Sequence, residues 1–329
     1  MIINMPFEKG CTLPPRPVTV NYAIIENGEL EVEWTKPNVY DVQLGGYNIY
    51  GYVGNTQPTD FNQYSLITSV DSSKTSAEIS MDSEYDYVLV ASVSTDGVIQ
   101  KDLSQSYQTT KISDTKTLSD YSWRDIEIIT NYRTASDYFS VGDTKTFTAD
   151  NISQTAMIYG FNHDTKEDDT IASVTFGLVS GCTKTTMSTT ASNANGWNGS
   201  GMRSYLNNTY YNLLPLELRK VIKPVRKKAS SGSSSPSILT SIDKLFLFSE
   251  IEVRGELSYS ISGEGKQYEG FKDASNRIKC YRTGTSASTW WLRSAKNGMS
   301  TSYVVVEANG SFSYADANSA YMVVYGFCI

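Results

Sequence analysis

Few residues of this chain have the chemistry of a catalytic site. The 329-residue sequence contains one histidine, His163, which is followed directly by Asp164. A serine hydrolase needs its histidine close to a nucleophile on an exposed turn, and the sequence has no G-x-S-x-G motif. We therefore interpret G-F-N-H-D as a turn, because Asn and Asp side chains bond to nearby backbone groups. The sequence predicts no catalytic residue and no enzyme.

The cysteines give no metal or redox site. Cys11, Cys182, Cys280 and Cys328 lie far apart in the sequence, without a C-x-x-C pair. Zinc and dithiol chemistry both require closer ligand spacing, and one histidine does not complete a metal site. We expect free thiols, no bound metal and no cofactor.

Two groups of charged residues could contact a ligand. The run K-P-V-R-K-K at 223–228 could touch an anionic polymer, but we favour a solvated loop at a hairpin tip. Arg293 follows two tryptophans, and an arginine beside such rings is usually stacked and paired inside the protein. We therefore predict a structural role for Arg293, with Glu250 or Glu252 as its partner.

Composition excludes several classes of protein. The formal net charge is -7, whereas a protein that follows the phosphates of a nucleic acid needs clustered excess Lys and Arg. The start MIINMPFEKG lacks a basic segment followed by an apolar run, and no stretch approaches ~18 consecutive apolar residues. We predict folding in a bacterial cytoplasm, with neither nucleic acid nor membrane as a partner. The 23 tyrosines fit both recognition surfaces and strand-rich folding.

The N-terminal part predicts an all-β sandwich. Residues 1–16 carry several prolines without periodicity, which indicates an extended arm. Within 17–112, Trp34 precedes a Lys-Pro turn, and Y-x-Y-x-L-x-A-S-V at 85–93 precedes Asp-Gly. These motifs resemble those of a fibronectin type III domain, an immunoglobulin-like β-sandwich that usually acts as a spacer. Strands are expected at 30–34, 47–53, 66–70, 76–80, 85–93 and 106–112.

Beyond a polar linker at 113–122, residues 123–329 predict a second domain of mixed α and β structure. Helices are expected to begin near Ser200 and at Pro215, a residue that suits a first helical turn. A Gly-, Ser- and Tyr-rich insertion at 255–271 could form part of a binding rim. Strands are expected at 144–148, 155–161, 172–178 and 245–248.

The last 41 residues, 289–329, combine two compositions. Trp290, Trp291, Leu292, Arg293 and Ser294 are followed by β-branched runs that are typical of buried strands. Between these runs lie segments made largely of Ser, Asn, Ala, Gly, Asp and Tyr, a composition that suits adaptable recognition. The sequence predicts a rigid apolar scaffold that carries a polar recognition surface.

This pattern resembles the C-type-lectin-like domain of bacteria and their phages. Its hallmark is W-W-L-R-S, followed by a Ser/Asn/Tyr-rich segment and an ending close to G-V-R-P-A-F-C-I. The resemblance covers roughly 122–329 and departs at Ala295, usually Pro, and at Met322, Val324 and Tyr325 in the ending. Further similar motifs are V-G-D-T-K at 141–145, G-F-N-H-D at 160–164, Trp197 with 203–207, and L-F-L at 245–247.

The resemblance implies a ligand-binding protein. In some relatives the domain is the variable protein of a diversity-generating retroelement, so diversification is possible here. We expect a phage virion protein of the tail tip or fibre, in which the lectin-like domain binds a host surface receptor, protein or glycan. Its N-terminal region would bind other tail proteins, and a homo-oligomer such as a trimer is compatible with that role. The alternatives are an adhesin on a bacterial surface and an enzyme of the formylglycine-generating type, whose chemistry rests on a reactive cysteine pair.

The same resemblance predicts where and how the ligand binds. Sugar-binding C-type lectins use calcium through E-P-N or Q-P-D followed by W-N-D, and none of these triplets occurs here. W-N-G at 197–199 lacks the carboxylate that calcium prefers, so binding is expected to be calcium-independent. The side chains after the hallmark are expected to lie on one face, with the tyrosines contributing most. These predicted ligand-binding residues are Asn297, Met299, Ser300, Thr301, Tyr303, Ser313, Tyr314, Asp316, Asn318 and Tyr321.

Overall fold

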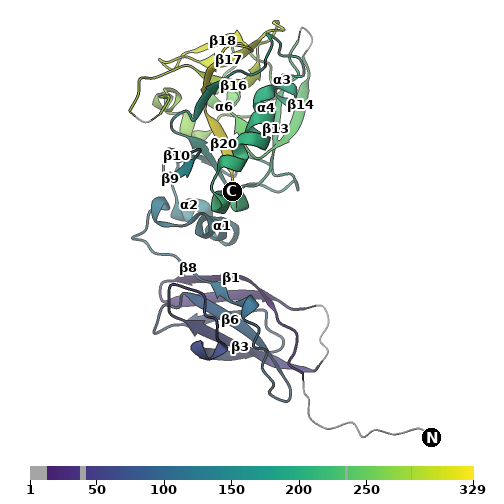
Figure 1. Cartoon of the computed structure of the whole chain (residues 1–329), viewed down its shortest axis with the longest axis vertical. Helices are drawn as coiled ribbons and strands as arrows, with labels where there is room; N and C mark the ends of the chain where they lie inside the picture. Colours follow the sequence, from purple (N-terminus) through teal and green to yellow (C-terminus); the bar gives the residue numbers. More distant parts are fainter. Residues whose placement is uncertain (1–12, 38–41, 234–235, 283) are drawn as a thin grey trace, which may run out of the picture. The chain divides into compact units, whose positions relative to one another are not determined.

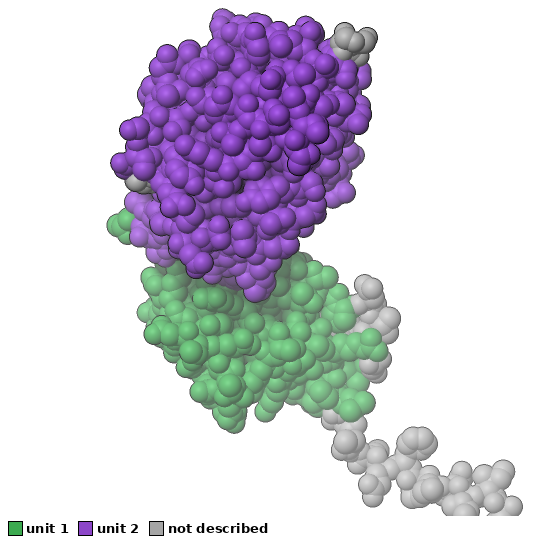
Figure 2. Space-filling view, turned by 45° about the horizontal axis from the view of Figure 1, so that its top comes forward, with its two compact units in different colours: residues 1–115 green, residues 116–329 purple. Residues whose placement is uncertain are grey.

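The computed structural model of the chain describes residues 13–37, 42–233, 236–282 and 284–329. The protein is mostly β-sheet and divides into two compact units, Met1–Thr115 and Lys116–Ile329. The ribbon in Figure 1 follows the chain through both units, and Figure 2 shows them in separate colours. The division falls inside the segment predicted as a linker. Of the predicted N-terminal arm, residues 1–12 lie outside the described residues.

Unit 1 is built from two sheets that share one core. In β2, the alternation E-L-E-V-E-W-T buries Leu30, Val32 and Trp34 on one face, as period-2 patterning predicts. Trp34 packs edge-on against Tyr47 of the second sheet, with ring centroids 5.2 Å apart. Within the described residues the sheet orders are β5-β2-β1-β8 and β4-β3-β6-β7. The strands are β1 Thr19–Glu26, β2 Glu29–Thr35, β3 Leu44–Tyr52, β4 Ser65–Asp71, β5 Ser76–Ser80, β6 Tyr87–Ser94, β7 Tyr107–Gln108 and β8 Thr110–Lys111.

Three details of unit 1 differ from the prediction. Strand β1 was not among the expected strands. The single strand expected at 106–112 is divided into β7 and β8, which belong to different sheets. The interruption is at Thr109, whose N–H and hydroxyl donate to the carbonyls of Asp86 and Tyr85. The predicted arm also ends earlier than residue 16, because Pro15 is buried and Ser92 donates a hydrogen bond to the carbonyl of Arg16.

Unit 2 contains, among its described residues, two five-stranded sheets and one separate hairpin. The sheet orders are β15-β20-β11-β10-β9 and β12-β19-β16-β17-β18, and the hairpin is β13-β14. The chain passes from one sheet to the other at Val324, which is buried between β19 and β20. The strands are β9 Thr144–Ala149, β10 Ile152–Phe161, β11 Val174–Leu178, β12 Thr183–Thr185, β13 Val225–Ser230, β14 Ile238–Asp243, β15 Phe246–Leu247, β16 Trp290–Ala295, β17 Ser302–Val306, β18 Phe312–Asp316, β19 Tyr321–Val323 and β20 Tyr325–Cys328.

Short helices cover the sheets of unit 2. Helix α1 begins after Ser122, whose hydroxyl accepts the N–H of Asp125, and Trp123 anchors it edge-on against Phe176 and Phe327. Ser200 caps α4 as predicted, and Pro215 directly precedes α5. No helix in the described part of the chain has the length and apolar character needed to cross a membrane. The helices are α1 Trp123–Tyr132, α2 Ala135–Tyr138, α3 Gly196–Gly199, α4 Gly201–Ser204, α5 Leu216–Val221 and α6 Glu250–Arg254.

Candidate functional site

The W-W-L-R-S segment forms β16, in the interior of unit 2. All six residues of this strand are buried. Trp290 stacks on Phe271, and its indole N–H donates to the carbonyl of Arg277 at 2.9 Å. The indole N–H of Trp291 donates to the carbonyl of Thr185 at 3.0 Å. Because both rings are packed and hydrogen-bonded, β16 is a fixed support for the strands beside it.

Arg293 has the structural role that we predicted. Its side chain is fully buried, and its guanidinium binds both carboxylate oxygens of Glu252, at 2.5 and 2.7 Å. The remaining donors reach the carbonyls of Lys228, Leu247 and Glu264 at 2.7–3.0 Å. Every donor of the planar group therefore has an acceptor, which is the condition for burying a charge at tolerable cost.

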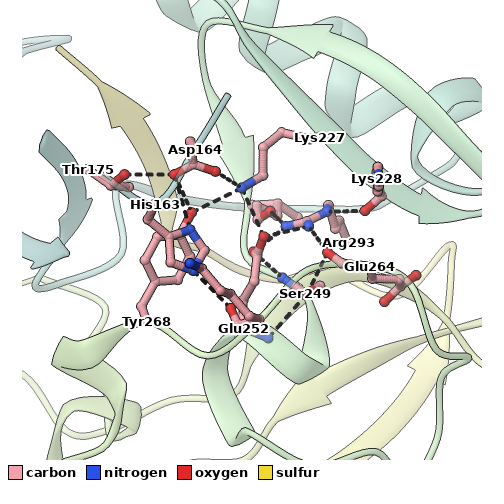
Figure 3. Close-up of polar contacts among 12 residues, drawn as sticks. His163, Asp164, Thr175, Lys227, Lys228, Ser249, Glu252, Glu264, Tyr268 and Arg293 are labelled. Atoms are coloured by element: carbon pink, nitrogen blue, oxygen red, sulfur yellow. Dashed lines mark hydrogen bonds and ion pairs between the residues drawn. The ribbon is translucent and has the colours of Figure 1, made fainter. Parts of the chain in front are cut away.

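The ion pair continues into a buried network (Figure 3). Lys227 donates to Asp164 at 2.7 Å, to Glu252 at 2.9 Å and to the hydroxyl of Tyr268 at 3.0 Å. Burial alone would raise the pKa of Asp164, but Lys227 and then His163 hold that pKa well below its usual range. Burial also acts to raise the pKa of the Glu252 carboxyl, but Arg293 and Lys227 lower it by more, so the net shift of this pKa is downward.

Two predictions are wrong at this network. The run at 223–228 is not a solvated loop, because β13 pairs with β14 and Lys227 is only 1% exposed. Asp164 does not stabilise a turn through nearby backbone groups, because its carboxylate accepts bonds from Lys227, Tyr268 and the hydroxyl of Thr175. The partners of Lys227 come from distant parts of the sequence, so local spacing gave no sign of them.

Glu264 forms no ion pair among the residues that the structure describes. It is buried, and it accepts the N–H of Ser230 at 2.7 Å while bonding the hydroxyl of Ser294. Burial raises the pKa of Glu264 to about 7, although the charge of Arg293 and the bonds from Ser294 and Ser230 act to lower it. A protonated Glu264 fits this site, since it needs no further positive charge.

A cavity of about 540 Å³ adjoins the network, with Arg226, Lys228 and Lys266 at its edge. His163 lies in its wall, stacked on Tyr268 with centroids 3.7 Å apart and bonded to the carbonyl of Lys266 at 3.0 Å. The acids of the cavity are bound by internal partners. Among the described residues, no group of three or more His, Cys, Asp or Glu side chains is placed to hold a metal ion.

The predicted ligand-binding residues do not share one face. β17 and β18 are antiparallel, with Val304 opposite Tyr314 and Tyr303 opposite Ala315. Since side chains alternate along a strand, Tyr314 and Tyr303 point to opposite sides of the sheet. Tyr303 is 1% exposed, packs near Trp291 and donates its hydroxyl to the carbonyl of Gly196 at 2.8 Å. The prediction that Tyr303 contacts ligand is therefore wrong, because β17 lies between β16 and β18 and is buried on both faces.

The remaining predicted residues occupy several settings. Tyr321 is half-buried against Trp291, on the side of the sheet opposite to Tyr314. Ser313 points to that same side, as Tyr303 does. Asp316 is exposed, and its carboxylate accepts the hydroxyls of Thr301 and Ser302, which lowers its pKa. Asn297, Met299, Ser300 and Asn318 are exposed.

One compact cluster forms around Tyr314, which is 43% exposed at the edge strand β18. Its ring centroid is 5.5 Å from that of Tyr259, and the Lys296 ammonium lies 5.4 Å from the Tyr314 ring and 5.8 Å from the Tyr259 ring. Met299, 36% exposed, lies one tight turn from Lys296. We call Tyr259, Lys296, Met299 and Tyr314 the tyrosine cluster. Two of its members, Tyr259 and Lys296, were missed as individual site residues, although the rim predicted at 255–271 includes Tyr259.

The tyrosine cluster is tied to the buried hallmark through Glu250. The hydroxyl of Ser294 accepts the N–H of Glu250 at 2.8 Å, at the start of α6. The fully buried Glu250 carboxylate then accepts the backbone N–H groups of Ser258, Tyr259 and Ser260 at 2.7–3.1 Å. Glu250 was predicted as a partner of Arg293, and it instead fixes the backbone that carries Tyr259.

The loop between β16 and β17 is fixed from the other side by Asn193. This buried side chain donates to the carbonyls of Met299 and Ser302 at 2.7 and 2.9 Å, and its backbone N–H donates to that of Ser300. The N–H of Asn297 donates to the carbonyl of Tyr259 at 2.7 Å. The cluster is thus held in place before any ligand binds, which lowers the entropy lost on binding.

Part of unit 2 is similar to a known family of domains. Residues 168–329 match a family model described as a domain of unknown function (DUF6273). This segment contains the hallmark strand, Glu250 and the whole tyrosine cluster. Neither the curated proteins nor the solved structures searched contain a match to the chain.

Proposed function

We propose that this chain is a binding protein in which the tyrosine cluster recognises a ligand on a bacterial surface. The observation that carries the proposal is the contrast between Tyr314 and strand β16. Tyr314 is 43% exposed at a sheet edge, whereas β16, which is linked to the tyrosine cluster through Ser294 and Glu250, is completely buried. Exposed aromatic rings on rigid backbone give large contact area with little loss of conformational entropy.

Unit 2 is proposed to be a C-type-lectin-like domain. Support comes from the buried W-W-L-R-S strand, the two sheets joined through Val324 and the short helices that cover them. Unit 1 is proposed to be a fibronectin type III-like spacer, supported by two mainly antiparallel sheets around a core that contains Trp34. These assignments rest on sequence motifs and strand order.

We further propose that the protein belongs to a phage tail, at its tip or fibre, where unit 1 and the N-terminal arm would bind other virion proteins. The alternative is an adhesin on a bacterial surface. Both place the tyrosine cluster against a host or neighbouring cell, and both need no cofactor.

An enzyme of the formylglycine-generating type is the least supported alternative. Burial raises the pKa of the Cys328 thiol well above its usual range, and the nearby Asp164 raises it further. Burial raises the pKa of Cys182 to about 12. Because the thiolate is the reactive form, neither residue suits nucleophilic or redox catalysis. The described cysteines, Cys182, Cys280 and Cys328, are free thiols.

The test compares two exposed tyrosines of unit 2. Fluorescently labelled full-length protein is mixed with a panel of bacterial species, and bound protein is measured by flow cytometry. Tyr314→Ala is expected to weaken binding to the recognised species by about 30-fold, the equivalent of ~2 kcal/mol for an aromatic anchor. Tyr132→Ala, in which the tyrosine is 37% exposed at the end of α1, is the matched control and should bind normally.

Two outcomes would contradict the proposal. One is that the wild-type protein binds no species of a broad panel. The other is that Tyr314→Ala and Tyr132→Ala bind equally well. A thermal melt of each variant shows whether loss of binding reflects loss of folding.

A further inference from the structure

Beside the tyrosine cluster, two arginines lie close to the ring of Phe312. The guanidinium carbon of Arg254, at the end of α6, is 5.3 Å from the centroid of the Phe312 ring, and that of Arg277 is 6.0 Å from it. Both distances are within the range of cation–π attraction. All three side chains are half-buried, so each has part of its surface in contact with solvent.

These arginines lack the partners that the buried Arg293 has. Within the described residues, neither Arg254 nor Arg277 forms an ion pair with a carboxylate. Arg277 donates one bond, to the carbonyl of Phe271 at 3.2 Å, and its buried Nε–H has no acceptor among the described residues. Arg277 has only a small effect on the exposed carboxylate of Asp273, because the lowered pKa of Asp273 is due chiefly to hydrogen bonds from Ser275. Cation–π attraction to Phe312 consumes no N–H group of either guanidinium, so it leaves the donors of Arg254 and the terminal donors of Arg277 for other partners.

The arginine pair continues the tyrosine cluster along one strand. Phe312 and Tyr314 are two residues apart on β18, so their side chains lie on the same face about 7 Å from each other. Lys296 beside Tyr314 also forms no ion pair among the residues described, and its ammonium donates to the carbonyl of Asn297 at 2.8 Å. One face of an edge strand therefore carries two aromatic rings flanked by three cations. The Asp316 carboxylate at the end of the same face is bonded to the hydroxyls of Thr301 and Ser302.

This charge is opposite to that of the chain, whose formal net charge is -7. A surface with three cations on an acidic protein attracts anions selectively, because the rest of the molecule repels them. Arginine N–H edges match the paired oxygens of carboxylate and phosphate groups. The tyrosine rings offer apolar faces with polar edges, which suit the mixed surface of a sugar ring.

We propose that the ligand of this face is an anionic polysaccharide of the bacterial envelope, bound along β18 with its acidic groups at Arg254, Arg277 and Lys296. The inference rests on the proposed function and specifies its ligand. A polymer fits because the cations occupy two positions along the strand, the two arginines at Phe312 and Lys296 at Tyr314, so that two units of an extended chain can each meet a positive charge.

The test uses an array of purified bacterial envelope polysaccharides, some uronate-bearing, some phosphodiester-bearing and some neutral. Full-length wild-type protein is expected to bind acidic members and to lose affinity as salt is raised from 50 to 500 mM, because salt screens the charges. The double variant Arg254→Gln/Arg277→Gln should bind at least tenfold more weakly, with a smaller salt dependence. Comparing uronate with phosphodiester members identifies the acidic group.

The matched control is Lys244→Gln. Lys244 lies 4.4 Å from the ring of Tyr211, so it is also a lysine stacked on tyrosine, but it is not part of the tyrosine cluster. This variant should change affinity less than twofold. A thermal melt of the double variant checks that both arginine substitutions leave the fold intact.

Three results would overturn the inference. Two come from the array: strongest binding to neutral polysaccharides, or equal affinity of the double variant and the wild type. The third is loss of cell binding after protease treatment of the cells, which would indicate a protein receptor. In each case, if Tyr314→Ala still weakens binding to untreated cells about 30-fold, the proposed function stands and only the ligand class is wrong. If Tyr314→Ala has no effect either, both proposals fail.

Discussion

Replacement of Arg293 by Met tests whether the buried network holds unit 2 together. The substitution keeps an unbranched side chain but removes every hydrogen bond of the guanidinium. It leaves Glu252 buried with Lys227 as its remaining cation, and it leaves the carbonyls of Lys228, Leu247 and Glu264 without these bonds. Removing one partner of a buried pair costs about 3–5 kcal/mol. For a unit of this size, that loss lowers the melting temperature by roughly 6–20 °C.

The assay is urea unfolding of the full chain, followed by tryptophan fluorescence. Four of the five tryptophans, at positions 123, 197, 290 and 291, lie in unit 2, so the signal reports mainly on that unit. Arg254→Met is the control: Arg254 forms no ion pair among the described residues, and its loss should change the free energy of unfolding by about 0.5 kcal/mol or less. A loss below ~1 kcal/mol for Arg293→Met would refute the structural role assigned to the network.

Three further predictions concern pH and metal. The pKa of Glu264 in the folded state, about 7, lies above its unfolded value, so between about pH 4.5 and 7 the folded state keeps a proton that the unfolded state has lost. The free energy of unfolding should therefore fall by up to ~3 kcal/mol as the pH rises across this window. Glu264→Gln should remove most of that fall, measured by urea unfolding at pH 5 and pH 7. Burial lowers the pKa of Lys279 to about 7, so between pH 7 and the unfolded value near 10.5 stability should rise with pH, and Lys279→Met should show a flatter profile from pH 7 to 9. An equally steep profile in either variant would contradict its assignment. Binding to cells should survive excess EDTA, and a loss that calcium reverses would contradict calcium-independent recognition.

Much of the fold could be predicted from local patterns. Alternation in E-L-E-V-E-W-T placed β2 and its buried Trp34, and Ser200 and Pro215 placed the starts of α4 and α5. These features depend on neighbours within a few residues, which sequence shows directly. The pattern W-W-L-R-S also gave the structural role of Arg293.

The network and the site depend on partners that local sequence cannot show. Lys227 can be buried because its ammonium binds the carboxylates of Asp164 and Glu252. Asp164 lies 63 residues earlier in the chain, and Glu252 belongs to α6. Tyr303 and Tyr314 each follow a serine in the sequence, yet strand order buries the first and exposes the second. Tyr259 belongs to the surface because Glu250 fixes its backbone, a contact that no periodicity indicates.

The most direct test of the account is hydroxyl-radical footprinting of the full chain, free and bound to the bacterial cells that it recognises. Tyrosine and methionine side chains react readily when exposed, so Tyr259, Met299 and Tyr314 should each lose most of their labelling on binding. Tyr132 and Leu213, which are 37% and 40% exposed elsewhere on unit 2, should be labelled equally in both states. Unchanged labelling of the three cluster residues, with protection at another surface, would contradict the claim that the tyrosine cluster is the recognition site.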